Sequence, residues 1–532
     1  MGAAEAGGKH PGESGMKRFC PGFRPAAACL ALVLFIGCAG GRRFTKNPDP
    51  DTWRSAAASL GERFPDCGAL ILEDHARVDV YPRESHSFSE YTRRTVIRIN
   101  DRRGLRFANV ILPYDAEAEV TGIRARALCP DGRVLTLEPS EIFDTTHNPE
   151  AVFFSDTRAK RFTVPGVEPG CFVEIEWSLA VGHFSFWNRW DFQSDVPVGS
   201  SSFTVRCPSD WPLRWKAYGI DVQPEVEATA KGVKADHVWR ASNLPPHRPE
   251  PALPAGEGPM RMLVSPAGMK SWDDAAAWLE SLFGERMKAG RGIREQVRSR
   301  TGDSTETLKA LFELVRDRVR YVAIEVGTGG YQPHFAESVL RRRYGDCKDM
   351  TVLLAAAGRE AGWTVYPALL ATANSGVLDT ALVSPAQFNH AVAVAVGPDG
   401  NRIWMDATEK TCPYGDLPWY DRNVPAMVLQ GDGKAHFIRT PGLDASAHRV
   451  NRVWHLQAEP DGTGTGCVSM TFNGTPAGEM RHLIGRMEGD GIRRWMAGQI
   501  LGRFPGAVCD SASAEALDSL ENPLRIRAFF SA

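Results

Sequence analysis

The chain has 532 residues, too many for one hydrophobic core, and its length predicts about three or four domains. Its 62 Lys and Arg nearly balance its 64 Asp and Glu, and a net charge of -2 argues against a dedicated nucleic-acid-binding protein, which needs a basic excess. With 43% hydrophobic and 24% charged residues, the composition excludes a mainly disordered or fibrous chain, and 11 Cys are too sparse for a disulfide scaffold.

Residues 1–38 have the pattern of an export signal. Basic residues precede the apolar run 26–37, which is shorter than the roughly 20 residues of a membrane-spanning helix but fits the apolar region of a secretory signal. The run ends in Phe35-Ile36-Gly37-Cys38, which resembles a bacterial lipobox. We therefore expect a periplasmic or cell-envelope protein that is anchored to the membrane by lipid on Cys38. A plainly secreted protein is the alternative.

The next part of the chain predicts a β domain. Residues 39–75 are expected to form a linker with a short helix at 51–64. From 76 to 262, short runs of alternating polar and apolar residues are separated by Asp-Gly and Pro-Gly turns, which is typical of an antiparallel β-sandwich. The aromatic cluster at 183–192 fits packing in the core or at an edge, with a carbohydrate-stacking surface as the alternative.

A helical pattern follows the proline-rich connection at 243–259. Within the region 263–430, apolar residues recur at helical spacing over 272–288 and 305–321. The chain contains no P-loop, no glycine-rich dinucleotide motif, no His-Glu-x-x-His motif and no zinc-type Cys or His pairs. We therefore predict no metal and no cofactor.

The last region, 431–532, returns to strand-like runs. One helix is expected among these strands, at either 478–487 or 491–500.

Cys347 is the candidate nucleophile. Apolar side chains recur at helical spacing over 350–361, and Asp346 and Asp349 suit the N-cap and third position of a capping box. Cys347 would then be the first helical residue, where unpaired N–H groups and the helix dipole favour a thiolate. The alternative is a small core residue, and the polar neighbours, including Lys348, argue against deep burial.

A base for this thiolate is found in two predicted strands joined by Gly397-Pro398-Asp399-Gly400. This sequence fits a type I turn whose last glycine is left-handed, and the resulting three-residue loop pairs Gly397 with Asn401. In that register His390 and Asp406 are diagonal neighbours on one face, so the carboxylate can orient the imidazole. A four-residue loop would place them on opposite faces. An edge histidine and a strand-end cap remain the alternatives.

Four motifs together carry a family resemblance: Tyr331-Gln332-Pro333, Gly345-Asp346-Cys347-Lys348-Asp349, Phe388-Asn389-His390 and Trp404-Met405-Asp406-Ala407-Thr408. They resemble the core of bacterial transglutaminase-like proteins, members of the papain-like cysteine superfamily. The preceding β domain is similar to the uncharacterised domain that often accompanies this core in envelope proteins.

The resemblance implies a Cys-His-Asp triad of Cys347, His390 and Asp406. It also implies an oxyanion hole that uses the Cys347 N–H, with Gln332 or Tyr331 as the second donor. The C-terminal β region stops short of its usual length, which leaves open whether it is truncated.

We therefore expect an α+β multidomain protein with an N-terminal antiparallel β-sandwich, a transglutaminase-like (papain-like) α+β core and a C-terminal β-rich region. The expected function is cysteine-dependent acyl transfer on a peptide or carboxamide bond, by a protease, amidase or transamidase. The alternative is a non-catalytic interaction lipoprotein that uses the core as a binding scaffold. The expected partners are a peptide or protein substrate, with cell-wall peptide among the candidates, and the membrane, but no nucleic acid.

Overall fold

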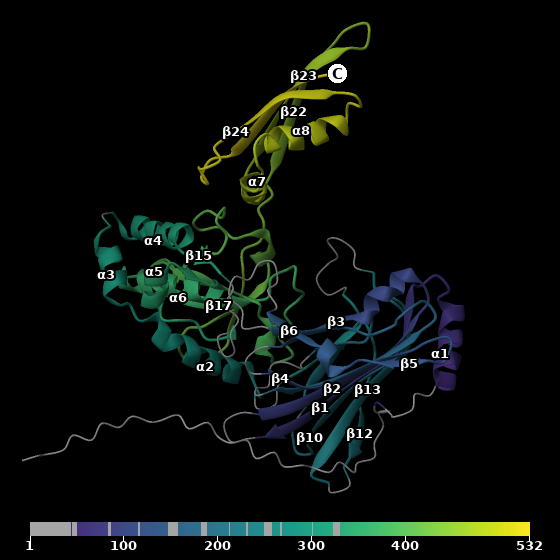
Figure 1. Ribbon diagram of the computed structural model, residues 1–532. Coiled ribbons are helices and arrows are strands. Elements are labelled where there is room, and N and C mark those ends of the chain that lie inside the picture. Colours follow the sequence, from purple (N-terminus) through teal and green to yellow (C-terminus); the bar gives the residue numbers. More distant parts are fainter. Residues whose placement is uncertain are drawn as a thin grey trace, which may run out of the picture. The chain divides into compact units, whose positions relative to one another are not determined.

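The computed structural model, shown in Figure 1, describes most of the chain beyond the predicted signal segment. The described residues are 44, 50–82, 87–114, 118–146, 158–181, 189–211, 213–229, 232–248, 258–265, 269–300, 302–322 and 330–532. Cys38 lies outside them, so its lipidation stays a prediction. Within these ranges, no helix has both the length and the apolar character that crossing a membrane requires.

The N-terminal part is rich in strands and begins with one helix, α1 (Pro50–Arg63). Its strands are β1 (Ala69–Pro82), β2 (Ser87–Ile99), β3 (Asn109–Tyr114), β4 (Ala118–Leu128), β5 (Val134–Thr136), β6 (Phe143–Thr146), β7 (Arg158–Thr163), β8 (Phe172–Val181), β9 (Arg189–Asp191), β10 (Val198–Pro208), β11 (Trp215–Tyr218), β12 (Glu225–Ala228), β13 (Lys234–Leu244) and β14 (Arg261–Val264). An eight-stranded sheet has the order β12-β13-β10-β1-β2-β8-β4-β5, and two small sheets are ordered β3-β7-β6 and β11-β14-β9.

One apolar core joins the large sheet to the two small ones. Val173 and Phe203 of the large sheet share it with Phe162 and Met262 of the small sheets. Part of the other face of the large sheet is covered by α1, whose Trp53 packs with residues of β1, β2 and β8 (Figure 1). The N-terminal part is therefore layered, as predicted.

Two details of this part differ from prediction. β1 and β10 pair in parallel, so the large sheet is not wholly antiparallel, because the long stretch between these strands leaves room for a crossover. β1 also starts at Ala69, within the stretch predicted as linker. Of the aromatic cluster, Trp190 and Phe192 are buried in the core, while residues 182–188 lie outside the described residues.

The central part combines helices with a five-stranded sheet. Its helices are α2 (Trp272–Phe283), α3 (Arg291–Arg298), α4 (Ser304–Arg318), α5 (Ala336–Arg342) and α6 (Cys347–Glu360). The sheet, ordered β19-β18-β17-β20-β21, is made of β17 (Thr364–Leu370), β18 (His390–Val396), β19 (Arg402–Met405), β20 (Pro425–Val428) and β21 (His436–Arg439). A short parallel pair, β15 (Arg320–Tyr321) and β16 (Tyr344–Gly345), precedes α6.

Helix α6 lies against β17 (Figure 1) and also packs against β18, which presents small side chains to it. Ala391, Ala393 and Ala395 share one core with Leu353 of α6. The valines that alternate with these alanines belong to a second core on the opposite face of the sheet. Side chains two residues apart in β18 therefore face α6. The hydroxyl of Thr351, in the first turns of α6, donates to the Ala391 carbonyl near the start of β18.

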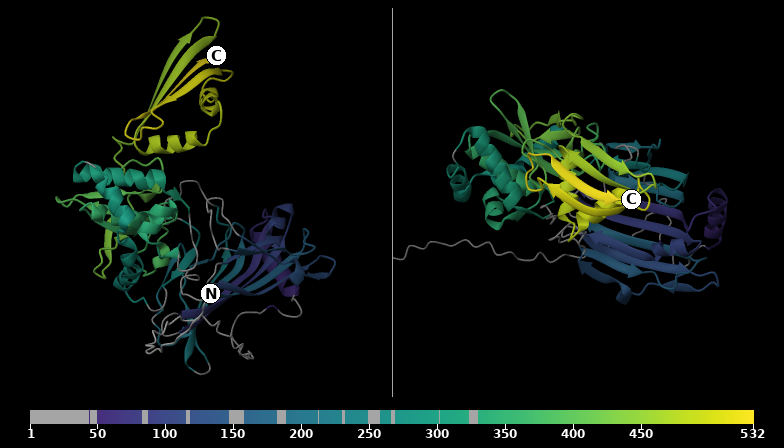
Figure 2. Two further views of the ribbon diagram at one scale, coloured as in Figure 1. Left: turned by 60° about the vertical axis from the view of Figure 1, so that its left-hand side comes forward. Right: turned by 90° about the horizontal axis from the view of Figure 1, so that it is seen from above.

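The C-terminal part is a four-stranded sheet with two helices on one face (Figure 2). The helices α7 (Thr475–Gly485) and α8 (Gly491–Leu501) lie between the second and third strands in the chain. The strands, in the order β22-β23-β25-β24, are β22 (Val450–Ala458), β23 (Gly464–Phe472), β24 (Val508–Glu515) and β25 (Leu524–Ser531). The prediction of a single helix was wrong, since both candidate segments are helical and both are buried against this sheet.

Candidate functional site

The N-terminus of α6 is built by the predicted capping box. The Asp346 carboxylate accepts a hydrogen bond from the Asp349 N–H at 3.1 Å, and the Asp349 carboxylate accepts from the Asp346 N–H at 3.4 Å. Cys347 is therefore the first helical residue, as expected, and it is half-buried. Gly345 is required just before it, because a Cβ there would lie 2.6 Å from the Cβ of Asp349.

The polar neighbours of Cys347 are themselves buried, which the sequence did not predict. Asp346, Lys348 and Asp349 are all inaccessible to solvent or nearly so. Lys348 tolerates burial because its ammonium group pairs with the Asp346 carboxylate. Burial opposes the charged ammonium, but the charges of Asp346 and Cys347 raise the pKa of Lys348 above its usual value. A buried positive charge therefore lies beside the candidate nucleophile.

The turn between β18 and β19 has the predicted register. Gly397 N–H donates to the Asn401 carbonyl at 2.9 Å, and Gly400 has φ +79°. The ladder then pairs Val396 with Arg402 and continues to Ala393 and Met405. His390, at the start of β18, and Asp406, just beyond β19, consequently lie on the same face of the two strands.

His390 and Asp406 form a buried hydrogen bond. The imidazole Nε2 lies 3.2 Å from Asp406 Oδ2, and the His390 side chain is 10% exposed. The other carboxylate oxygen, Oδ1, accepts from the backbone N–H of Thr408 at 2.9 Å and from its hydroxyl at 2.7 Å. Asp406 is thus held from both sides and can orient the ring.

The electrostatics of this pair favour an imidazolium. Burial lowers the pKa of His390, but the charge and hydrogen bond of Asp406, the hydrogen bond to Cys347 and the charge of Asp421 raise it well above the usual value. Burial raises the pKa of Asp406, yet His390 and Thr408 lower it overall. Because Nε2 faces Asp406, Nδ1 is the ring nitrogen that remains for the thiol. The structure thus brings Cys347, His390 and Asp406 into one chain of contacts.

The segment proposed to supply a second oxyanion donor is anchored to the same helix turn. The backbone N–H of His334 donates to Asp349 Oδ1 at 2.7 Å, and its ring Nδ1 lies 3.0 Å from Oδ2. Tyr331 packs its ring against Trp278, with the centroids 5.2 Å apart. Gln332 is half-buried between these two anchored residues. Its role as a donor, like that of Tyr331, stays a prediction.

Asp421 lies beside His390 and Asp406, and the sequence did not predict it as part of the site. It ends a short 3-10 helix (Trp419–Asp421), is fully buried, and places Oδ2 3.6 Å from His390 Nε2. Its only signal in the sequence is an acidic residue after two aromatic residues, outside all four motifs. His390, Asp406 and Asp421 each present a ligand atom within 4.8 Å of the others, a donor set that could hold a cation.

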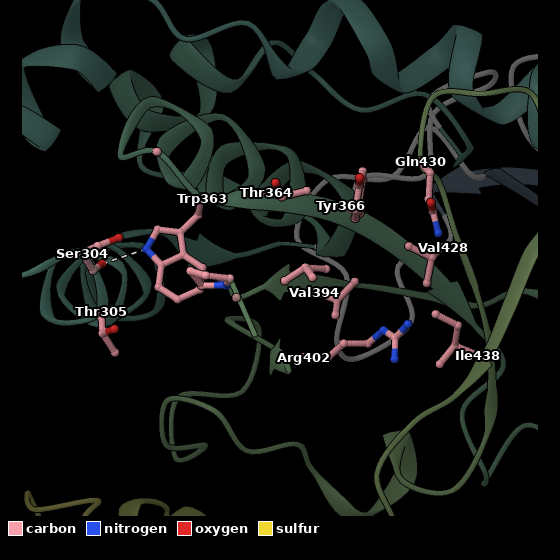
Figure 3. Close-up of a pocket in the computed structure, with 14 residues that line it drawn as sticks. Ser304, Thr305, Trp363, Thr364, Tyr366, Val394, Arg402, Val428, Gln430 and Ile438 are labelled. Atoms are coloured by element: carbon pink, nitrogen blue, oxygen red, sulfur yellow. Dashed lines mark hydrogen bonds between the residues drawn. The ribbon is translucent and has the colours of Figure 1, made fainter. Parts of the chain in front are cut away.

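An open cavity lies elsewhere in the central part. It measures about 490 Å³ and takes in Val394 and Val396, at the far end of β18 from His390. Trp363 lines it, with its indole N–H donating to the Ser304 carbonyl at 2.8 Å, and Arg402 is another lining residue (Figure 3). Cys347, His390 and Asp406 do not line this cavity; they are called the Cys347 cluster below.

Comparisons with known proteins identify the families of two parts of the chain. The family model of the transglutaminase-like superfamily matches residues 291–405, and that of a domain of unknown function, DUF3857, matches residues 87–248. No curated protein matched the sequence.

The chain is also similar to solved structures. One, from Parabacteroides distasonis and described as a "putative protease", has a TM-score of 0.58 and 12% identity over 87% of this chain and 93% of that one. Another, described as a "putative cysteine protease" from Cytophaga hutchinsonii, has a TM-score of 0.16 and 10% identity over 60% of this chain and 76% of that one, too low to carry an argument. The first likeness supports the fold alone. Residues 291–405 are therefore a domain of the transglutaminase-like superfamily, preceded in the chain by a DUF3857 domain.

Proposed function

We propose that the protein is a cysteine-dependent acyl-transfer enzyme that acts on a peptide or carboxamide bond. The observation that carries this proposal is the contact chain from the half-buried Cys347 through His390 to Asp406. A buried imidazole that Asp406 keeps protonated, next to a thiol at a helix N-terminus, is the arrangement that generates a thiolate–imidazolium pair.

The chemistry divides into two steps. The Cys347 sulfur attacks the carbonyl carbon and forms a C–S bond, and the C–N bond breaks as His390 passes its proton to the leaving amine. Water or a second amine then attacks the thioester carbonyl carbon and gives its proton to His390, and the C–S bond breaks to release the acid or the new amide and regenerate the Cys347 thiolate. The backbone N–H of Cys347, in the first turn of α6, has no acceptor within the helix and can stabilise the oxyanion.

The nature of the second nucleophile distinguishes hydrolase from transamidase. A thioester that water reaches is hydrolysed, whereas a site that excludes water favours transfer to an amine. The 490 Å³ cavity lies away from Cys347, so the acyl substrate would lie across the Cys347 cluster and not in that cavity.

The test is to trap the acyl-enzyme on the purified protein. A labelled glutamine peptide and a mixture of cell-wall peptides are incubated with the protein, and the thioester on Cys347 is detected by mass spectrometry. The proposal expects a hydroxylamine-sensitive adduct that disappears in Cys347→Ala but persists in Cys412→Ala, a buried-cysteine control. The alternative, a non-catalytic lipoprotein, expects peptide binding without any adduct.

We also propose that the enzyme is tethered to the cell envelope through lipid on Cys38. The support is the apolar run 26–37 and the lipobox-like sequence that ends it. Labelled fatty acid should be incorporated into the full chain in cells and not into Cys38→Ala. A chain that remains unlabelled but is still exported would contradict the anchor and leave the acyl-transfer proposal intact.

A further inference from the structure

Asp421 is a buried carboxyl group that the chemistry above does not use. Its side chain is fully inaccessible to solvent, and among the described residues no N–H or O–H group donates a hydrogen bond to either carboxylate oxygen. A buried carboxylate without a donor is costly, so such groups normally bind a cation or stay protonated. The position of Asp421, 3.6 Å from the His390 Nε2, makes its state relevant to the base.

Asp406 has room to accept a hydrogen bond from Asp421 if Asp421 carries a proton. A carboxylate can accept about four hydrogen bonds, and Asp406 accepts two from Thr408 through Oδ1 and one from His390 through Oδ2. One position on Asp406 is therefore left, and the ligand atoms of the two carboxyl groups lie within 4.8 Å of each other. Two ionised carboxylates at this spacing would repel each other, whereas a shared proton joins them.

We propose that Asp421 is a positioning residue whose neutral carboxyl group donates a hydrogen bond to Asp406 and so fixes the orientation of His390. The proposal rests on the proposed function only for its effect on reactivity, since the hydrogen bond itself is a property of the buried cluster. A chain of three groups, Asp421 to Asp406 to His390, then lies behind the thiol. It keeps Asp406 from turning away from Nε2 when the ring moves its proton.

The electrostatics support a neutral Asp421 at physiological pH. Burial, partly opposed by His390, and the charge and hydrogen bond of Asp406 raise the pKa of Asp421 to about 8. Burial and the charge of Asp406 raise the pKa of the Cys412 thiol well above its usual value, so this neighbour stays neutral as well. The cluster thus carries one carboxylate and one imidazolium.

The experiment compares Asp421→Asn with Asp421→Ala and Asp421→Leu in the full chain. An Asn amide can donate to Asp406 as the protonated acid does, Ala cannot donate, and Leu fills the space without donating. The first readout is the low-field proton resonance of the His390 ring, assigned by its absence from His390→Ala. The second is the rate of Cys347 alkylation by iodoacetamide. Circular dichroism and thermal melting identify any variant that fails to fold, and the Leu variant replaces Ala in that case.

The expected result is that the Asn variant keeps the His390 resonance and reacts at close to the wild-type rate. The Ala and Leu variants should shift or lose the resonance and react about 10- to 100-fold more slowly. This is the loss that is typical when a residue that orients a functional histidine or carboxylate by a hydrogen bond is removed. An Asn variant as impaired as the Ala variant would overturn the proposal, because the carboxylate charge or a bound cation would then be what matters. An unchanged resonance in Ala and Leu would overturn it too. A donor-dependent resonance in a protein whose wild-type Cys347 is unreactive would support it and count against the proposed function.

Discussion

The two ends of helix α6 lie in the same domain and differ in almost every physical respect. At its N-terminus, Cys347 meets a cluster of buried polar groups centred on His390. Beyond its C-terminus, Gly362 and Trp363 border an open cavity of about 490 Å³. This cavity does not include Cys347, the candidate nucleophile. The candidate site is therefore marked by convergent polar groups and not by this cavity.

The helix dipole explains part of this difference. The N-terminus of a helix carries partial positive charge and stabilises an anion, which suits a thiolate at Cys347, while the C-terminus favours cations. Arg402 borders the cavity. Substitutions at either end of α6 therefore test this difference.

The largest effect is expected from removing the base. His390→Ala should reduce the rate of Cys347 alkylation near neutral pH by about 100-fold or more, because the imidazolium partner of the thiolate is lost. The measurement is iodoacetamide labelling followed by peptide mass spectrometry, with Cys412 as an internal control. Burial raises the pKa of Cys412 well above its usual value, so this thiol should react slowly in both proteins. An unchanged pH profile of Cys347 would show that His390 does not activate it.

The next effect concerns the stability of the same end of α6. Lys348→Met should lower the free energy of opening of α6 by about 3 kcal/mol, because it leaves the Asp346 carboxylate buried without its partner. Adding Asp346→Asn should restore most of this loss, since Asn keeps the N-cap and removes the charge. Native-state hydrogen exchange of the α6 amides measures both changes. Equal exchange in the single and double variants would exclude the ion pair as the cause.

A smaller effect is expected on the way in which folding stability depends on pH. The folded pKa of His390 is raised, so its contribution is fully present below its ordinary value near 6.5 and is lost as pH rises through the folded value. The pKa of Asp421 is raised to about 8, so its contribution to folding stability also decreases as pH rises towards that value. The melting temperature should therefore fall as pH rises from about 6.5 towards 8. Asp421→Asn should make this fall shallower, and a slope that it leaves unchanged would contradict the assignment.

The smallest effect is expected at the cavity. Arg402→Gln should change the alkylation rate of Cys347 by less than about twofold, because an exposed charge at the far end of β18 is screened from the cluster. The comparison is made with His390→Ala in the same assay. A loss approaching that of the histidine variant would show that the two ends are coupled.

The parts of the site that local rules govern could be predicted from the sequence. Asp346 and Asp349 mark the start of α6 because a capping box is a contact between residues three apart. Gly400 sets the register of β18 and β19 because the left-handed conformation selects the loop length. His390 and Asp406 therefore share a face because of a turn and a strand pairing that lie within a span of seventeen residues.

Other features could not be predicted because they depend on contacts between distant segments. Lys348 is buried only because several elements enclose the turn that follows Asp346, and the sequence pattern around it is that of an exposed residue. The parallel pairing of β1 with β10 and the presence of both α7 and α8 also depend on packing, which overrides local propensity.

The sequence by itself determined the ordered set of Cys347, His390 and Asp406 and the elements that carry them, because capping, periodicity and turn geometry act over a few residues. Only the tertiary structure decided that Asp421 faces His390 and that the thiol lies beside a buried lysine. The physical reason is that burial and electrostatic coupling depend on which surfaces meet, and no short-range pattern records which distant segment will cover a given group.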